Sequence, residues 1–363
     1  MTLNDISEIR LHNQQIQSSR FKNAKDLLAW MGAVQAQDYA MAKWAVGVRL
    51  PGSTDLAIEE AFRKGEIIRT HLLRPTWHFV SADDIYWILG LTAPHIKSLL
   101  RARHIQLELT ETIVNKSKSV VEKALLGGNH LTREELMFQL GNAQINTDGQ
   151  RAAHLMLLFE LDGLVCSGAP KGKKQTYTLL EERVPKSLSF NRDEALAELA
   201  KRYFTSHGPA TVQDFIWWSG LPVKDARNAL EMVKSQFISV ETEQQMLWFT
   251  DLYQATKTNN QPAYLLPAYD EFIISYRDRS ASILAENHKK AISENGIFRP
   301  IVVQNGKVTG IWKRVQKKNK ILIEIECFHS QIQPANEGLM DATKQFGQFI
   351  NQDTELTFLP EPG

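Results

Sequence analysis

The chain has 363 residues, 43% of them hydrophobic and 23% charged, an ordinary composition for a folded protein of two or three domains. Its formal net charge of +1 excludes a uniformly basic protein, so any affinity for nucleic acid has to come from local clusters of Lys and Arg. No apolar run approaches the roughly 18 residues of a membrane span, and the N-terminus lacks the order of a secretory signal, so we expect a cytoplasmic protein with no membrane partner.

The first repeated helix is expected after Asn23. In NAKDLLAWMG (23–32), Asn23 is a good N-cap residue, Asp26 stands three positions later, and Gly32 suits the left-handed end of a helix. The same order of N-cap, acid, apolar residue and final glycine recurs in TREELMFQLG (132–141) and TVQDFIWWSG (211–220). We therefore expect three copies of one short helix that ends in a tight turn.

Two glutamines, Gln35 and Gln37, follow the first of these turns in GAVQAQDYAMAKWAVGVR (32–49). Residues i and i+2 of an extended segment point to the same side, so both amides are expected to project into one cleft. A glutamine amide takes no proton at neutral pH, so such a pair suits only a reaction that needs no strong base. A purely structural role is the alternative, because side-chain amides mostly bond backbone or water.

A second helix and a hairpin are expected after each copy. The second helices are TDLAIEEAFRKGE (54–66), QRAAHLMLLFELDG (150–163) and VKDARNALEMVKSQ (223–236). The strand pairs are IIRTHLL and TWHFV (67–73, 76–80), LVCSG and TYTLL (164–168, 176–180), and FISVE and LWFTD (237–241, 247–251). Helix, turn, helix and hairpin is the winged-helix order, so the sequence predicts three winged helices in tandem.

The first hairpin carries two histidines, His71 and His78, whose spacing is not that of a metal site. The two cysteines, Cys166 and Cys327, also lack ligand spacing, so we expect no metal and no cofactor. Arg74 and His78 are interpreted as groups on one side of this hairpin that contact a phosphate or orient a neighbour.

The residue pattern changes after KTNNQPAY (257–264), a polar stretch that we interpret as a linker. Alternating β-branched and aromatic residues, with Asn305-Gly306 as a type I′ turn signal, predict a small antiparallel sheet or barrel. A last helix, NEGLMDATKQFGQFI (336–350), is expected to pack on it. The charged residues of YDEFIISYRDR (269–279) are expected to form internal salt bridges, although an arginine there can also face DNA; they are Asp270, Glu271, Arg277, Asp278 and Arg279.

The expected fold is therefore α+β and mainly α, with three tandem winged-helix motifs and a small C-terminal antiparallel β-barrel. The expected divisions are a winged helix with the glutamine pair at 1–82, two more winged helices at 83–187 and 188–258, and the barrel with its helix at 259–363.

Two clusters of cations lie on predicted hairpins, where flexible side chains can reach phosphates. A solvated surface is the alternative for any one of them. The clusters are Lys171, Lys173 and Lys174, and then Lys313, Arg314, Lys317, Lys318 and Lys320.

Five stretches resemble the AlkZ/YcaQ-like winged-helix DNA glycosylases: AVQAQDYAMAKWAVGVRL, RPTWHFVSADD, GPATVQDFIWWSGL, LLPAYDEFIISYRDR and GKVTGIWKR. The resemblance runs from about Ile9 to Phe349. It implies a Gln-x-Gln catalytic motif, which places Gln35 and Gln37 as catalytic residues. Pro75 stands where the family pattern has glycine after the hairpin arginine, which puts the shape of that turn in doubt.

The function implied is hydrolysis of the N-glycosidic bond of N7-alkylated purines, bulky adducts and interstrand crosslinks included. The partner is damaged double-stranded DNA bound by a monomer, which would be nucleoid-associated in a bacterium. The alternatives are a non-catalytic DNA-binding regulator and a protein-interaction scaffold. The residues expected to contact DNA are Tyr39, Trp44, Arg74, His78, Lys171, Lys173, Lys174, Arg277, Arg279, Trp312, Lys313, Arg314, Lys317 and Lys318.

Overall fold

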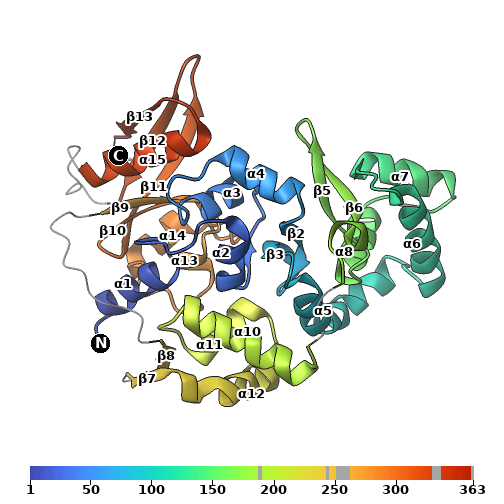
Figure 1. The fold of residues 1–363 in the computed structure, drawn as a ribbon, viewed down its shortest axis with the longest axis horizontal. Coiled ribbons are helices and arrows are strands. Elements are labelled where there is room, and N and C mark those ends of the chain that lie inside the picture. The colour runs from blue at the N-terminus through green and yellow to red at the C-terminus, as the bar shows by residue number, and fades with distance from the viewer. Residues whose placement is uncertain (187–189, 243–244, 251–261, 329–336, 361–363) are drawn as a thin grey trace.

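The computed structural model describes residues 1–186, 190–242, 245–250, 262–328 and 337–360, and its fold is α+β (Figure 1). The N-terminal helix α1 (Leu3–Asn13) begins with a capping box at Thr2. Most of the expected linker, residues 257–261, lies outside the described residues, and Ala263 already belongs to a strand.

The first unit is a set of helices around a three-stranded sheet of order β1-β3-β2, with β3 paired antiparallel to both neighbours. Asn23 caps its first helix and Asp38 its second, each by accepting a backbone N–H with its side-chain oxygen. The elements are α2 (Ala24–Met31), β1 (Val34–Gln35), α3 (Tyr39–Gly47), α4 (Asp55–Arg63), β2 (Ile67–Leu72) and β3 (Thr76–Ser81).

The second unit follows the long helix α5 (Ile85–Gln106) and repeats this order, with a sheet β4-β6-β5. Thr132 forms the expected capping box, but Gly141 lies inside its helix, which continues to Asn142, so the expected glycine stop is wrong there. The elements are α6 (Glu111–Leu125), β4 (Leu131–Thr132), α7 (Arg133–Asn142), α8 (Arg151–Leu161), β5 (Val165–Lys171), β6 (Lys174–Leu179) and the short α9 (Leu180–Arg183).

The third unit has the same order, although its first strand is reduced to the bridge between Ala210 and Trp248. Thr211 forms a capping box and Gly220 ends the helix in the left-handed conformation, as expected. The elements are α10 (Arg192–Ser206), α11 (Val212–Ser219), α12 (Val223–Val233), β7 (Ile238–Glu241) and β8 (Met246–Phe249).

The expected alignment of the repeats is wrong in the first unit. By position between helix and sheet, α2 corresponds to α6 and α10, and it is α3 that corresponds to α7 and α11. The pattern of cap, acid and glycine misled the alignment because it marks the ends of any short helix and carries no information on helix order.

The C-terminal part is an open five-stranded sheet of order β13-β12-β11-β10-β9, and β13 runs parallel to β12, so the expected closed antiparallel barrel is wrong. The YDEFIISYRDR stretch contributes a short helix, α13, where the residue pattern predicted a strand. The elements are β9 (Ala263–Leu266), α13 (Glu271–Ile274), α14 (His288–Ala291), β10 (Ile301–Gln304), β11 (Lys307–Gln316), β12 (Ile321–Cys327), α15 (Glu337–Ile350) and β13 (Thr354–Phe358).

The turn between β10 and β11 has the expected two-residue form. Asn305 and Gly306 have φ angles of 48° and 71°, and Gln304 pairs with Lys307 across them. A type I′ turn needs positive φ at both central residues, which Asn and Gly adopt most easily.

Two tryptophans belong to the core that the first unit shares with the C-terminal sheet. Trp44 and Trp312 are 1% and 2% exposed, and their indole nitrogens donate to the carbonyls of Leu265 and Leu266. Both rings also pack on Phe346 of α15, with 5.1 Å between centroids in each pair. The expectation that these two tryptophans contact DNA is therefore wrong, because indoles that fill a core have no face left for a base.

A buried ion pair fixes the same junction. Arg49 and Asp270 are both fully buried and are joined by two parallel hydrogen bonds of 2.8 Å. The guanidinium also donates to the backbone and side-chain oxygens of Gln14, so α1, the end of α3 and the start of α13 meet at one cation. This pair confirms that Asp270 forms an internal salt bridge.

We predict that Arg49→Met lowers the free energy of unfolding by about 3–5 kcal/mol, because it leaves the Asp270 carboxylate buried without its partner. Chemical denaturation measures the change. Lys64→Met is the control, since Lys64 pairs with Glu60 on an exposed helix face, and its effect is expected to stay below about 0.5 kcal/mol. Equal effects of the two substitutions would contradict the assignment.

Candidate functional site

The backbone of the Gln-x-Gln segment is held on both sides. Gln35 ends β1 opposite His78, and the N–H of Ala36 donates to the carbonyl of Trp77 over 2.7 Å. The carbonyl of Ala36 accepts from Nε of Arg69 at 3.0 Å. The segment is therefore a rigid part of the first unit up to the start of α3.

A buried carboxylate completes this support from the C-terminal part of the chain. Oε1 of Glu271 accepts the backbone N–H of Gln35 at 2.6 Å, and Oε2 accepts from the indole of Trp218 at 3.2 Å and from the hydroxyl of Ser275. Burial alone would raise the pKa of Glu271, but the neighbouring His207 and Ser275 outweigh burial and lower it to about 2. Glu271 is therefore a buried anion directly behind Gln35. The sequence indicated only an internal ion pair here.

The two glutamine side chains differ in exposure. Gln35 is 6% exposed, and its Oε1 lies 3.5 Å from a terminal nitrogen of Arg74. Gln37 is exposed in the loop between β1 and α3. Asp38, the carboxylate next to the pair, caps α3 by accepting the N–H of Met41 at 3.1 Å. One amide is thus buried at the end of β1 and the other is exposed, and neither of the two pockets described below is lined by the pair.

His78 lies in the interior behind the glutamine pair and not on the surface. It is 2% exposed, and its Nδ1 is 2.9 Å from the carbonyl of Thr76. Burial lowers the pKa of His78 to about 4, against the opposing effect of Glu271. The expectation of a phosphate contact is therefore wrong for this histidine, and the other interpretation, that it orients a neighbour, remains open.

Tyr39 is half-buried and bonded within the first unit. Its hydroxyl donates to Glu59 of α4 at 2.9 Å, and the same carboxylate pairs with Lys43 at 3.0 Å. Burial raises the pKa of Tyr39 well above its ordinary value, so its hydroxyl stays protonated. Tyr39 therefore ties α3 to α4 immediately after the glutamine pair.

The two basic hairpins extend to the same side of the molecule, the upper edge in Figure 1. On β5–β6, Lys171 pairs with Glu135 at 3.0 Å and Lys174 with Glu134 at 2.5 Å, while Lys173 is exposed at the tip. Exposed ion pairs of this kind contribute at most about 1 kcal/mol, so these lysines can exchange a carboxylate for another anion.

The β11–β12 hairpin approaches the site itself. Arg314 lines a pocket of about 450 Å³ together with Ala40, three residues after Gln37. Lys313 pairs with Glu324 at 3.0 Å, and Lys317 and Lys318 are exposed near the turn.

Trp217 is a residue that the sequence analysis did not single out. It is 39% exposed, whereas the adjacent Trp218 is 1% exposed in the core. The guanidinium carbons of Arg74 and Arg279 lie 5.1 and 5.3 Å from the centre of its ring. Arg277 is exposed next to them and donates to Gln213 at 3.3 Å. The only sequence signal was the WW pair on one helix, which does not tell which indole faces out.

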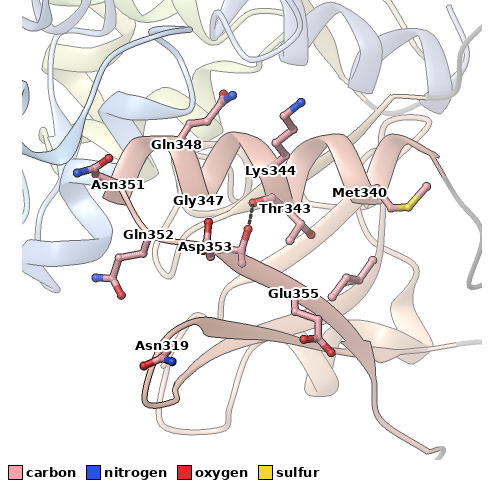
Figure 2. Close-up of a pocket in the computed structure, with 12 residues that line it drawn as sticks. Asn319, Met340, Thr343, Lys344, Gly347, Gln348, Asn351, Gln352, Asp353 and Glu355 are labelled. Atoms are coloured by element: carbon pink, nitrogen blue, oxygen red, sulfur yellow. Dashed lines mark hydrogen bonds between the residues drawn. The ribbon is translucent and has the colours of Figure 1, made fainter.

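A pocket in the C-terminal part lies elsewhere. It has a volume of about 1020 Å³ and lies between α15, β13 and the turn that joins β11 to β12, and Figure 2 shows its mostly polar lining, including Asn319, Lys344 and Glu355. No residue of β1 or of the loop that follows it lines this pocket. It is therefore separate from the glutamine pair.

The described ranges contain neither a metal-binding cluster nor a membrane-spanning helix. No group of three or more His, Cys, Asp or Glu side chains could hold a metal ion there. Every helix of the described part is too short or too polar to span a bilayer.

Repeated helix and hairpin units with basic hairpins on one side define a nucleic-acid-binding protein. The family model described as DNA glycosylase AlkZ-like matches residues 28–349, and the chain therefore belongs to the AlkZ-like DNA glycosylase family.

A DNA glycosylase of Streptomyces sahachiroi resembles the chain both in sequence and in fold. The interstrand DNA cross-link repair glycosylase of Streptomyces sahachiroi is 23% identical over 332 residues, which cover 85% of this chain and 87% of that protein. The solved structure of the Streptomyces sahachiroi DNA glycosylase AlkZ superposes with a TM-score of 0.81 at 19% identity, and the match covers 99% of this chain and 100% of that one. The fold is therefore shared along the whole length.

The buried His78 gives a test of this arrangement in stability. Its pKa is about 4 in the folded chain and about 6.5 in the unfolded chain, so the folded state binds fewer protons between these values. The contribution of His78 to the free energy of unfolding is therefore fully present above pH 6.5. About 3 kcal/mol of it is lost as the pH falls towards 4. We predict that unfolding free energies of the wild type fall more steeply from pH 7 to pH 4.5 than those of His78→Asn. Parallel pH profiles would show that His78 titrates alike in both states.

Proposed function

We propose that the chain hydrolyses the N-glycosidic bond of N7-alkylated purines in double-stranded DNA, bulky adducts and interstrand crosslinks included. The observation that carries the proposal is the Gln-x-Gln segment. Its backbone is fixed by Trp77, Arg69 and Glu271, and it presents the amides of Gln35 and Gln37 in place of a titratable acid or base.

Amides suit this substrate because the leaving group is already activated. A purine alkylated at N7 carries a positive charge, which weakens its bond to C1′, so the base departs without a general acid. The bonding electron pair moves to the purine and neutralises it, water oxygen bonds to C1′, and the released proton goes to solvent. The products are the free alkylated base and an abasic site, and no cofactor enters the balance.

The remaining barrier lies on the sugar, which develops positive charge as the base leaves. Two amide carbonyl dipoles directed at C1′ stabilise that charge and hold a water in line, by positioning and preorganised electrostatics. The buried anion of Glu271 behind Gln35 adds a negative potential of the right sign, in a region where low polarity strengthens it. A neutral, undamaged base gains little from this arrangement, which favours damaged DNA.

We propose further that the three repeated units are winged helices and that, with the C-terminal module, they divide the chain at 1–82, 83–187, 188–258 and 259–363. The first two units have the helix, strand, helix, helix and hairpin order that supports this interpretation, and in the third the first strand is reduced to a bridge. Three units in one chain supply several contacts along a duplex without a partner, so the active form is proposed to be a monomer.

We predict that Gln35→Ala and Gln37→Ala each slow the release of 7-methylguanine by roughly ten- to a thousand-fold under single-turnover conditions, the range for the loss of one preorganised polar contact. DNA affinity and melting temperature are expected to stay near wild type, because the loss lies on the chemical step. Gln37→Glu is expected to keep part of the activity, since a carboxylate also stabilises positive charge.

Asp38→Asn is the matched control for this series. Asn caps a helix about as well as Asp, so α3 stays intact while the carboxylate that follows the pair in sequence is removed. Wild-type rates for both alanine variants with an inactive Asp38→Asn would overturn the amide mechanism. An inactive wild type that still binds DNA would support the alternative of a non-catalytic DNA-binding protein.

We predict that replacing Lys313, Arg314, Lys317 and Lys318 together with Ala weakens duplex binding and makes it less dependent on salt. Each lost phosphate contact reduces the slope of log K against log salt by about 1. Fluorescence anisotropy at several salt concentrations, with duplexes of different sequence, gives both quantities. The melting temperature is expected to change little, because exposed charges contribute little to stability.

Four exposed lysines on other elements supply a control with the same loss of charge. An equal drop in affinity and slope for both quadruple variants would show that net charge, and not the β11–β12 hairpin, determines binding. The control residues are Lys64, Lys123, Lys234 and Lys289.

A further inference from the structure

Two arginines from distant parts of the chain lie beside one exposed indole. Arg74 follows β2, and Arg279 follows α13, and both guanidinium groups contact the ring of Trp217 on α11. We propose that Arg74, Arg279 and Trp217 form a binding site for the backbone phosphate next to the damaged nucleotide. The proposal rests on the proposed function, because it takes damaged DNA as the ligand.

The hydrogen-bonding capacity of the two arginines is largely unused. Arg74 makes one contact of 3.5 Å, to Gln35, and its Nε is buried without a partner. Arg279 donates to two backbone carbonyls, those of Ile273 at 3.0 Å and Arg277 at 3.5 Å. In the part of the chain that the structure describes, neither pairs with a carboxylate. Guanidinium groups with free donors are well matched to the oxygens of a phosphate.

The electrostatics also favour an anion here. Burial lowers the pKa of Arg74, against the opposing charge of Glu271. Burial and the charge of Arg74 lower the pKa of Arg279 to about 10, against the opposing charges of Asp214 and Asp278. Both groups therefore remain charged at neutral pH while they repel each other. A bound phosphate would remove this repulsion, and the partly buried setting would strengthen its attraction to both cations.

The backbone around the arginines is built for close contact. Leu73, directly before Arg74, has a φ of 59°, a conformation that is uncommon for a bulky side chain. Gly220 has a φ of 67°, and a Cβ there would lie 3.0 Å from the carbonyl oxygen of Leu73 and 3.2 Å from Cγ of Arg74. Only glycine lets the end of α11 approach the hairpin turn this closely, which brings Arg74 to Trp217.

The indole is a fixed platform for the two cations. Its Nε1 donates to the carbonyl of Ile274 at 2.8 Å, so the ring is anchored to α13 at one edge while 39% of the residue stays exposed. Attraction between a guanidinium group and the face of Trp holds each arginine in place before DNA arrives.

The proposed phosphate site lies directly beside Gln35, one of the two residues proposed to act on C1′. The terminal nitrogen of Arg74 is 3.5 Å from the Gln35 oxygen that is proposed to face C1′. That distance is at the limit of a hydrogen bond, so a phosphate can easily replace Gln35 as the acceptor. The exchange frees the glutamine carbonyl for the sugar and positions the sugar at the same time.

The test uses duplexes that contain 7-methylguanine and a single neutral methylphosphonate, moved in turn to each phosphate near the lesion. For the wild type, we expect a loss of about tenfold in affinity at one or two phosphates adjacent to the lesion. Arg74→Gln and Arg279→Gln are expected to bind the duplex with an unmodified backbone about tenfold more weakly than the wild type does. A methylphosphonate at those same phosphates is expected to weaken the binding of these variants no further.

Arg277→Gln is the matched control, because Arg277 lies on the same loop but donates to Gln213 and does not contact Trp217. It is expected to keep the full methylphosphonate effect. Lysine variants of Arg74 and Arg279, which keep the charge, show by their melting temperatures and partial recovery of affinity that the glutamine variants fail through lost charge and not through misfolding.

The phosphate site would be overturned if the arginine variants lost as much affinity as the wild type at every methylphosphonate position. If the wild type is active in the same experiment, the proposed function stays intact. A wild type that releases no base, but whose two arginines still couple to the phosphates beside the lesion, would overturn the proposed reaction and keep the site. Coupling only to phosphates remote from the lesion would also overturn the proposal, because the site would then be a general DNA contact.

Discussion

The carboxylate of Glu271 is the constraint on which the arrangement of the site depends. It accepts the backbone N–H of Gln35 from the first unit and the indole N–H of Trp218 from the third, while its own helix belongs to the C-terminal part. A buried charge is tolerated only while its hydrogen bonds are satisfied, so none of these elements can move away without leaving an unpaired anion in the core. The glutamine pair is consequently fixed where three parts of the chain meet.

The neighbouring residue Asp270 makes an equally strict contact of a different kind. Two carboxylates adjacent in sequence are stabilised differently, since Arg49 neutralises Asp270 while neutral donors surround most of Glu271. The first arrangement is an ion pair in which the two charges cancel. The second is a buried carboxylate behind Gln35 that has His207 as a neighbour at 3.7 Å.

The arginines that support the fold differ from the candidate DNA contacts in how many of their hydrogen-bond donors are used. Arg49 and Arg69 are buried and bonded to fixed oxygens, whereas Arg74 and Arg279 stand beside Trp217 with donors to spare. On the β5–β6 hairpin, Lys171 is held by an exposed carboxylate that it can leave at little cost. A chain with a net charge of +1 can thus present positive surface locally, because several of its cations lie on two hairpins that extend to the same side.

The sequence by itself determined many of the elements, and it predicted the glutamine pair as the candidate site. N-cap residues such as Thr211, the turn at Asn305-Gly306 and the Gln35 and Gln37 pair all depend on local chemistry, which is readable from neighbours in the chain. The tertiary structure alone decided that α3 and not α2 is the counterpart of α7, that Trp44 and Trp312 are core residues, and that Trp217 is exposed beside two arginines. It also decided that the last sheet stays open and that Glu271 supports Gln35. These outcomes depend on contacts between residues far apart in sequence, and the burial of an indole or a carboxylate is set by those contacts, while helix caps and periodicity report only on near neighbours.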